Sequence, residues 1–141
     1  MNIKIASDHA GFDLKQFIIS NLAGFNWEDG GCYSLESIDY PDFAHPLAAY
    51  ISERPAEKGV LLCGSGNGMQ MAANKHPNVR AALCWSKEIA CLARSHNDAN
   101  ILVLPARFIS QTEAIEIITA FFETPFEGGR HAKRVEKINL P

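Results

Sequence analysis

The chain has 141 residues, a formal net charge of −3, 47% hydrophobic residues and 21% charged residues. That length fits one domain with a sizeable core and is too short for two. The slightly acidic balance argues against nucleic acid as a partner, and no run of about 18 apolar residues predicts a membrane span. We therefore expect a single domain over residues 1–141 that binds neither nucleic acid nor a membrane.

The N-terminus and the cysteines both favour the cytoplasm. Residues 1–5 run directly into a strand-like pattern without a charged and apolar leader, so we expect no signal peptide. Cys32, Cys63, Cys84 and Cys91 form no CxxC pair, and none lies at short spacing from a histidine, which gives a zinc site little support. Disulfides are not expected in a reducing compartment, and most of these thiols should be small buried apolar groups.

Strand and helix patterns alternate in the first part of the chain. The expected order is a strand at 2–6, a helix at 12–22, a weak strand at 25–28 and, after a glycine turn and a polar loop, a helix at 43–54. The helical segments are recognised by apolar residues that recur at helical spacing, as in Leu14, Phe17 and Ile18.

The second part of the chain holds apolar runs that alternate with helices. Runs of this kind, unlike alternating patterns, are typical of parallel strands buried on both faces, and they occupy residues 60–63, 81–84 and 101–104. Helices are predicted at 67–74, 87–95 and 111–122, the last opening with the capping-box pattern Ser110-Gln111-Thr112-Glu113. The whole order predicts an α/β fold with a doubly wound, five-stranded parallel sheet and helices on both faces.

The C-terminal segment has a different character. Gly128 and Gly129 break the chain after Pro125, and a basic helix with little apolar surface is predicted over about residues 129–139. Because this helix has little to bury on its own sheet, we expect it to dock elsewhere, with a second subunit as one option.

Ligands of open parallel sheets bind beyond the carboxyl ends of the strands. Four loops of this chain should lie at that edge, and they are Ser7-Asp8-His9, residues 63–68, Trp85-Ser86 and Pro105-Ala106-Arg107. Polar and titratable groups therefore gather at the predicted ligand-binding edge.

The turn Gly64-Ser65-Gly66-Asn67-Gly68 is the most informative of these loops. It lacks the Gly-Lys-Ser/Thr ending of a P-loop, and its GxGxG spacing differs from a dinucleotide fingerprint. Three glycines between a buried strand and a helix allow close ligand approach and aim free N–H groups at the ligand. An anion or oxyanion cradle is the favoured interpretation, and a merely tight turn is the alternative.

Cys63 begins this turn. A thiol near a helix N-terminus is expected to have a lowered pKa, and its thiolate is a usable base or nucleophile. A buried core cysteine is the alternative for Cys63 and the preferred interpretation for the other three cysteines.

The remaining candidates each have an ordinary structural explanation. Asp8-His9 could cap a helix, and His96-Asn97-Asp98 could form a simple turn. Arg130 and Arg134 are four residues apart, so they share one helical face on which two guanidinium groups suit a phosphate, although most such pairs are solvated charge. His131 and Lys133 could assist them or be bystanders, and His45 and His76 are expected to be structural.

Six segments taken together resemble the type B ribose-5-phosphate isomerases, in a family that also holds galactose-6-phosphate and allose-6-phosphate isomerases. In chain order they are Ala6-Ser7-Asp8-His9-Ala10-Gly11, Asp39-Tyr40-Pro41, Cys63-Gly64-Ser65-Gly66-Asn67-Gly68, Ala72-Ala73-Asn74-Lys75, His96-Asn97-Asp98-Ala99-Asn100 and Gly128-Gly129-Arg130-His131. The resemblance covers nearly the whole chain. It implies a Rossmann-like fold, no metal or other cofactor, and a homodimer with active sites between the subunits, into which the C-terminal helix reaches across. Pairing of dimers into tetramers stays open.

The resemblance also implies catalytic roles. Cys63 would move the proton between C1 and C2 of the sugar, and Ser65 would help to hold the thiolate. His96 would open the furanose ring, with Asp8 assisting proton transfer at the sugar oxygens. Some members use a glutamate base in the helix after the glycine turn, but here that position is Met69, so the sequence resembles the cysteine type.

Other residues would bind the substrate. Tyr40 and Asn97 would contact the sugar, the turn residues Gly64, Gly66, Asn67 and Gly68 would stabilise the enediolate oxygen, and the phosphate would be bound by His9, Arg107, Arg130 and Arg134. The expected reaction interconverts D-ribose 5-phosphate and D-ribulose 5-phosphate. A hexose-6-phosphate isomerase is the alternative within the same chemistry, and a non-catalytic sugar-phosphate or nucleotide sensor is the alternative from another class.

Overall fold

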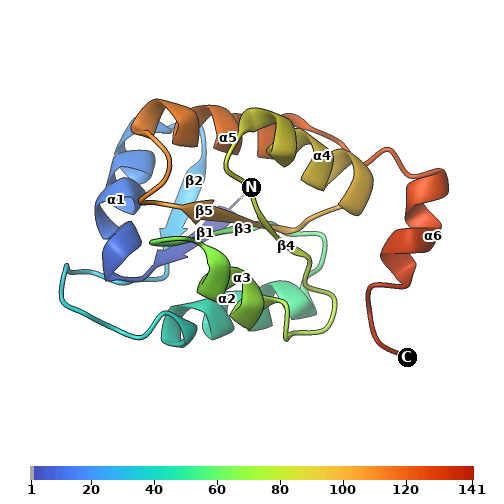
Figure 1. The fold of residues 1–141 in the computed structure, drawn as a ribbon, viewed down its shortest axis with the longest axis horizontal. Helices are drawn as coiled ribbons and strands as arrows, with labels where there is room; N and C mark the ends of the chain where they lie inside the picture. Colours follow the sequence, from blue (N-terminus) through green and yellow to red (C-terminus); the bar gives the residue numbers. More distant parts are fainter. Residues whose placement is uncertain (1) are drawn as a thin grey trace.

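The structure, a computed structural model, describes residues 2–141. Five parallel strands form one sheet in the order β2-β1-β3-β5-β4 (Figure 1). The strands are β1 (Asn2–Ser7), β2 (Asn26–Asp29), β3 (Gly59–Cys63), β4 (Ala81–Leu83) and β5 (Ile101–Pro105). The helices are η1 (His9–Gly11), α1 (Phe12–Asn21), α2 (Pro41–Glu53), α3 (Asn67–Ala73), α4 (Lys87–Asn97), α5 (Gln111–Glu123) and α6 (Arg130–Glu136). The predicted doubly wound, Rossmann-like α/β fold is confirmed.

Helices cover both faces of the sheet, with α1, α4 and α5 on one face and α2 and α3 on the other (Figure 1). Successive side chains on a strand point to opposite faces, so each continuous apolar run supplies both layers of the core. In β3, for example, Val60 and Leu62 pack beneath the first helix layer, and Leu61 and Cys63 pack against the second.

The direction in which the chain adds strands to the sheet reverses between β1 and β3. From β1 the chain crosses through α1 to β2 on one side, and it then returns through α2 to β3 on the other. Such a switch point leaves a crevice at the carboxyl ends of the two diverging strands. Ser7 ends β1 and Cys63 ends β3, so this crevice opens between Asp8 and Cys63.

A buried lysine holds the segment beside the end of β1. The side chain of Lys15 is fully buried, and its Nζ donates to Asp29 Oδ1 and to the Cys32 carbonyl, both at 2.5 Å. Ser7 in turn exchanges backbone hydrogen bonds with this segment, because its N–H donates to the Gly31 carbonyl at 2.6 Å and its carbonyl accepts from the Cys32 N–H at 2.8 Å. Lys15 thereby holds the segment that follows β2 in place next to the end of β1, directly before Asp8 and His9.

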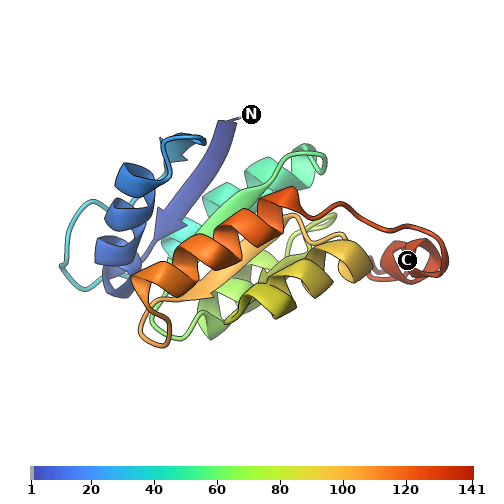
Figure 2. The same ribbon diagram turned by 90° about the horizontal axis from the view of Figure 1, so that it is seen from above.

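The C-terminal helix differs from its prediction in length. It ends at Glu136 rather than near residue 139, because the Lys137 and Ile138 N–H groups close tighter turns onto the carbonyls of Arg134 and Val135. Asn139 then pairs with Asn78, whose N–H donates to Asn139 Oδ1 at 3.1 Å. Figure 2 shows α6 beyond the C-terminal end of α4, away from the faces of the sheet. No helix within residues 2–141 is long and apolar enough to span a membrane.

Candidate active site

Cys63 lies at the carboxyl end of β3 with only 5% of its surface exposed. Its Sγ accepts a hydrogen bond from the Gly66 N–H at 3.2 Å. Burial raises the pKa of the Cys63 thiol and the Asp8 charge adds to that rise, whereas backbone N–H groups of Met69, Gly66 and Ser65 act in the opposite direction. The expectation of a lowered pKa is therefore wrong, because the loss of water around the thiolate outweighs the amide dipoles at the start of α3.

At two glycines of the turn after Cys63, an added Cβ would collide with a neighbouring side chain. Gly66 has φ +80°, and a Cβ there would lie 2.3 Å from Cδ1 of Leu83. A Cβ on Gly68 would lie 2.4 Å from the ring of Tyr40. The turn thus packs tightly between Leu83 of β4 and the Tyr40 ring, which lies directly against it. Ser65 is exposed, and its Oγ accepts from the Asn67 N–H at 3.4 Å, so Ser65 acts on the thiol through its backbone N–H.

Asp8 lies close enough to the thiol to act on its charge, and His9 follows Asp8 at the start of η1. The Asp8 N–H donates to the carbonyl of Leu62 at 3.2 Å, and the Asp8 Oδ1 accepts from the Gly11 N–H at 3.1 Å, which orients a carboxylate that is only 6% exposed. His9 Nδ1 accepts from the Ile38 N–H at 3.3 Å. A neutral His9 therefore carries its proton on Nε2, where it can donate to an anion.

Arg107 completes this group of residues. Its backbone N–H donates to the Gly64 carbonyl at 3.0 Å, and its Nη1 lies 3.3 Å from where a Cβ of residue 64 would be. Its exposed guanidinium therefore runs along the turn. The structure brings together the predicted site residues of the carboxyl edge, namely Asp8, His9, Tyr40, Cys63, Arg107 and the Gly64–Gly68 turn.

The other predicted residues form a second group. His96 and Asn97 end α4, and Arg130 and Arg134 lie in α6. The ring of His96 stacks on that of His131, with centroids 4.2 Å apart and planes at 13°. Burial lowers the pKa of His131, and the neighbouring His96 acts in the same direction. His131, to which the sequence assigned no definite role, is thus the direct neighbour of His96.

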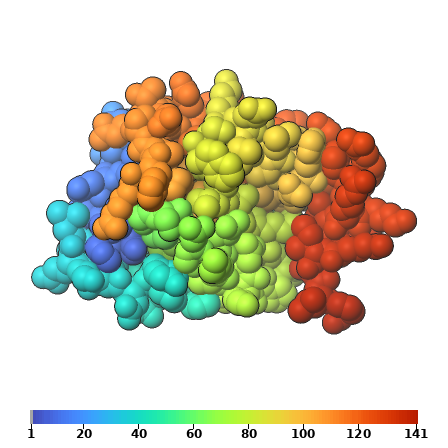
Figure 3. Space-filling view, in the orientation of Figure 1, coloured from blue at the N-terminus to red at the C-terminus, as the bar shows by residue number. Residues whose placement is uncertain are grey.

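The two groups do not meet within one chain. The helix of a crossover runs antiparallel to the strands it joins, so α4 starts at the carboxyl end of β4 and returns to the amino end of β5. Its eleven residues span about 16 Å, which carries His96 away from the edge that holds Cys63. Figure 3 shows the C-terminal segment, in red, at one end of the molecule and the segment around residues 10–40 at the other.

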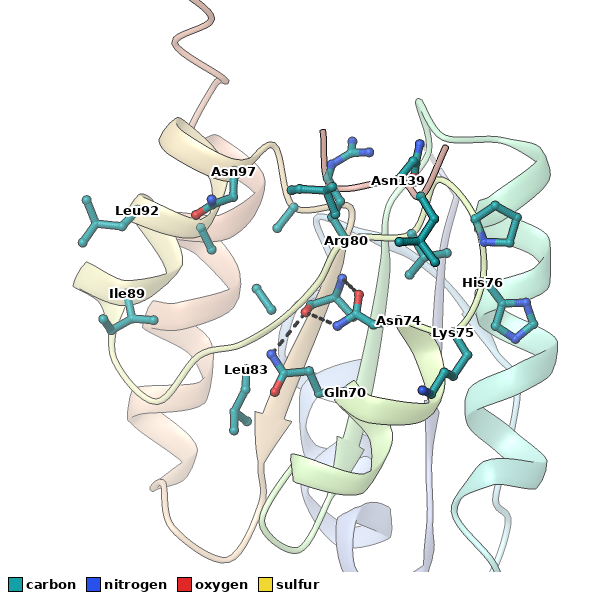
Figure 4. Close-up of a pocket in the computed structure, with 18 residues that line it drawn as sticks. Gln70, Asn74, Lys75, His76, Arg80, Leu83, Ile89, Leu92, Asn97 and Asn139 are labelled. Atoms are coloured by element: carbon teal, nitrogen blue, oxygen red, sulfur yellow. Dashed lines mark hydrogen bonds between the residues drawn. The ribbon is translucent and has the colours of Figure 1, made fainter. Parts of the chain in front are cut away.

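A groove of about 700 Å³ lies between α3 and α4, over the outer side of β4 (Figure 4). Ala81 of β4 lines the groove, and the side chains of Asn74 and Gln70 both donate hydrogen bonds to its carbonyl, at 2.9 and 3.3 Å. Its wall on the α4 side is largely apolar and includes Ile89 and Leu92. Met71 of α3 and Trp85, which follows β4, are further exposed apolar side chains on these elements.

A family model described as Ribose/Galactose Isomerase matches residues 3–138. The chain belongs to the ribose/galactose isomerase family. The predicted family is therefore confirmed, and with it the prediction of an isomerase.

Individual members of the ribose/galactose isomerase family are similar over almost the whole chain. The ribose 5-phosphate isomerase of Thermotoga maritima superposes with a TM-score of 0.94 at 51% identity, covering 98% of this chain and 97% of that one. The Mycoplasma genitalium ribose-5-phosphate isomerase B, solved with bound ribulose-5-phosphate, superposes with a TM-score of 0.93 at 45% identity. The match covers 97% of this chain and 93% of that one. The ribose-5-phosphate isomerase B of Escherichia coli is 38% identical over 138 residues, which are 96% of this chain and 93% of that protein.

Proposed function

We propose that this protein interconverts D-ribose 5-phosphate and D-ribulose 5-phosphate through an enediolate, with Cys63 as the base. The observation that carries the proposal is the thiol of Cys63, held beside the Asp8 carboxylate and against the Gly66 N–H, in a chain of the ribose/galactose isomerase family. A binding module has no need of an acid, a thiol and a glycine cradle at one edge, which disfavours a sensor.

The reaction begins with the cyclic sugar. His96 protonates the ring oxygen while the hydroxyl on C1 loses its proton with the help of Asp8, and the C1–O bond to the ring breaks to give the open aldehyde. The Cys63 thiolate then removes the proton from C2, and the electron pair moves into the enediolate. The same thiol returns that proton to C1 while one proton moves from O2 to O1, so the ketose forms without oxidant, reductant or metal.

The remaining predicted residues position the substrate. Backbone N–H groups of Gly64, Gly66, Asn67 and Gly68 are directed at the enediolate oxygen, where the loss of one donor typically costs about 3 kcal/mol. Tyr40 and Asn97 contact the sugar, and Ser65 supports the thiolate. His9, Arg107, Arg130 and Arg134 hold the phosphate, so that binding energy remote from the reacting carbons fixes them against Cys63.

A second copy of the chain completes each site. His96 and Arg130 stand at the other edge of the sheet from Cys63, so one chain alone holds two incomplete halves. A two-fold axis perpendicular to the strands reverses strand direction and sets the carboxyl edge of one copy beside the amino edge of the other. A homodimer therefore forms two sites, each with Cys63 from one subunit and His96 from its partner.

The β4 edge is the surface we assign to this pairing. The groove beside β4, together with exposed Met71, Trp85 and Leu92, offers apolar surface next to Asn97. The C-terminal helix, which lies off its own sheet, is placed to dock on the partner subunit. Residues 1–141 then work as one isomerase domain, and the four free cysteines suit a reducing cytoplasm.

The direct test follows ribulose 5-phosphate formed from ribose 5-phosphate by purified protein in the presence of EDTA. Wild-type protein should turn over, and Cys63→Ala should lose roughly 10²–10⁴-fold in kcat while still binding substrate. Cys91→Ala, which removes a partly exposed thiol outside the site, is the control and should stay active. Near-normal activity of Cys63→Ala would refute the role of Cys63 as the base. Turnover of hexose 6-phosphates alone would keep the mechanism and change the assigned substrate. Substrate binding without any turnover would favour a non-catalytic sensor.

A further inference from the structure

Three side chains with metal-binding atoms converge at the C-terminal end of α4. His96, Glu127 and His131 place their ligand atoms within 4.8 Å of one another. They come from α4, from the connection that follows α5, and from α6. The Glu127 N–H donates to the Ser95 carbonyl at 3.0 Å, and this bond ties the connection to α4 and brings the carboxylate to His96.

The donor set suits zinc. Two imidazoles and one carboxylate, with a fourth position open, are the ligands that zinc takes in many protein sites, at about 2.0–2.2 Å. Calcium and magnesium prefer oxygen ligands alone, so two imidazoles disfavour them.

The ligand atoms of the three side chains are close enough to share one metal ion, but the two histidine rings are not yet oriented toward a common position. The two rings are stacked at 4.2 Å with planes at 13°, and the nitrogen lone pairs of stacked rings lie in nearly parallel planes that do not meet at one ion. One ring must turn to direct both nitrogens at a single ion, and the terminal torsion of histidine is broad enough for that. The Glu127 side chain is 59% exposed, and its Oε2 already lies 3.5 Å from His131 Nε2, so the carboxylate can follow.

We propose that His96, Glu127 and His131 form a zinc site and that zinc bound there inhibits the enzyme. The inhibition rests on the proposed function, because zinc would occupy the ring nitrogen with which His96 opens the sugar. The binding itself does not depend on that function. Arg130 and Arg134 lie close enough to His131 to act on its charge, and their repulsion of a cation makes the site reversible rather than a permanent structural centre.

The test measures zinc binding first, by competition with a chromophoric chelator and by calorimetry on the full-length protein. Glu127→Gln should bind zinc about tenfold more weakly or worse, since it replaces a charged ligand. Glu136→Gln removes the same charge from an exposed position of α6 and should bind zinc like wild type. Cobalt(II) as a second probe should give a tetrahedral visible spectrum without a thiolate charge-transfer band, which separates this site from Cys63.

The second readout is inhibition. Zinc should inhibit wild type and Glu136→Gln reversibly, with full recovery on adding EDTA. Glu127→Gln should keep its zinc-free activity. It should need a zinc concentration at least about tenfold higher than wild type for the same inhibition. Equal zinc affinity in wild type and Glu127→Gln, or a thiolate band with cobalt, would overturn the site. Glu127-dependent binding in a protein that turns over no sugar phosphate would keep the site and refute the proposed function instead.

Discussion

The Gly66 N–H donates to Cys63 Sγ across 3.2 Å, at a thiol whose surface is only 5% exposed. The amide stabilises the thiolate, and burial destabilises it more strongly, so the pKa of the Cys63 thiol lies above its ordinary value. A thiol with a raised pKa is protonated for most of the time at neutral pH, and its thiolate is a strong base once it forms.

Alkylation by iodoacetamide should report this environment. The rate at Cys63 should rise with pH to a midpoint above the roughly 8.5 of an ordinary cysteine, because only the thiolate reacts and burial disfavours it. Cys84 is fully buried, which raises its pKa to about 12, so it should stay unmodified in native protein. Peptide mass spectrometry across a pH series separates the two sites, and a Cys63 midpoint below that of a free thiol would contradict the structure.

Gly68→Ala should damage the site more than the fold. The added Cβ would lie 2.4 Å from the Tyr40 ring, which is 39% exposed and can therefore move away. If Tyr40 contacts the sugar as proposed, displacing it should lower kcat/KM by about 10- to 100-fold with little change in the thermal midpoint. Gly24→Ala, where a Cβ meets nothing within 4 Å, is the matched control. Unchanged kinetics in Gly68→Ala would remove Tyr40 from the site.

Two inactive variants should complement each other if sites are shared. Cys63→Ala and His96→Asn damage opposite halves, so a mixed dimer of the two has one intact site and one doubly damaged site. After subunit exchange, half of the dimers are mixed, and activity should recover to about a quarter of wild type. Assays before and after exchange by mild denaturation and refolding measure this. No recovery, with mixed dimers demonstrated by mass, would place each whole site within one chain.

Lys15→Met should destabilise the protein strongly. The Lys15 side chain is fully buried with its Nζ 2.5 Å from Asp29 Oδ1. Its removal takes away the charge that pairs with Asp29, which keeps the Gly31 N–H at 2.9 Å, and it leaves the Cys32 carbonyl without the Lys15 donor. Breaking a buried pair in this way typically costs about 3–5 kcal/mol of the free energy of unfolding. Arg54→Ala breaks an exposed ion pair with Glu53 and should cost about 0.5 kcal/mol or less. Urea denaturation of both variants gives the comparison, and equal losses would contradict the assigned role of Lys15.

Much of the fold could be predicted because its signals are local. Val60-Leu61-Leu62-Cys63 and Ile101-Leu102-Val103-Leu104 are short continuous apolar runs, the pattern that strands covered on both faces require. Ser110 and Glu113 form the capping box that the sequence indicates, with both reciprocal hydrogen bonds present. The glycine turn and the polar residues at the strand ends were predictable for the same reason, since each depends on neighbours in the chain.

The tertiary structure decided what depends on residues far apart in sequence. Lys15 has an ordinary helical sequence context, and only the packing of Asp29 and Cys32 against it makes it a buried charge. The stack of His131 on His96 follows from where α6 meets α4, which no spacing predicts.

The sequence by itself determined the strand and helix order, the glycine turn after Cys63 and the family, because each of these depends on local periodicity or on short motifs. Only the tertiary structure decided the direction of the Cys63 pKa shift and the separation of Cys63 from His96. The first depends on how much water the folded core removes from one sulfur atom, and the second on the antiparallel return of α4 across the sheet.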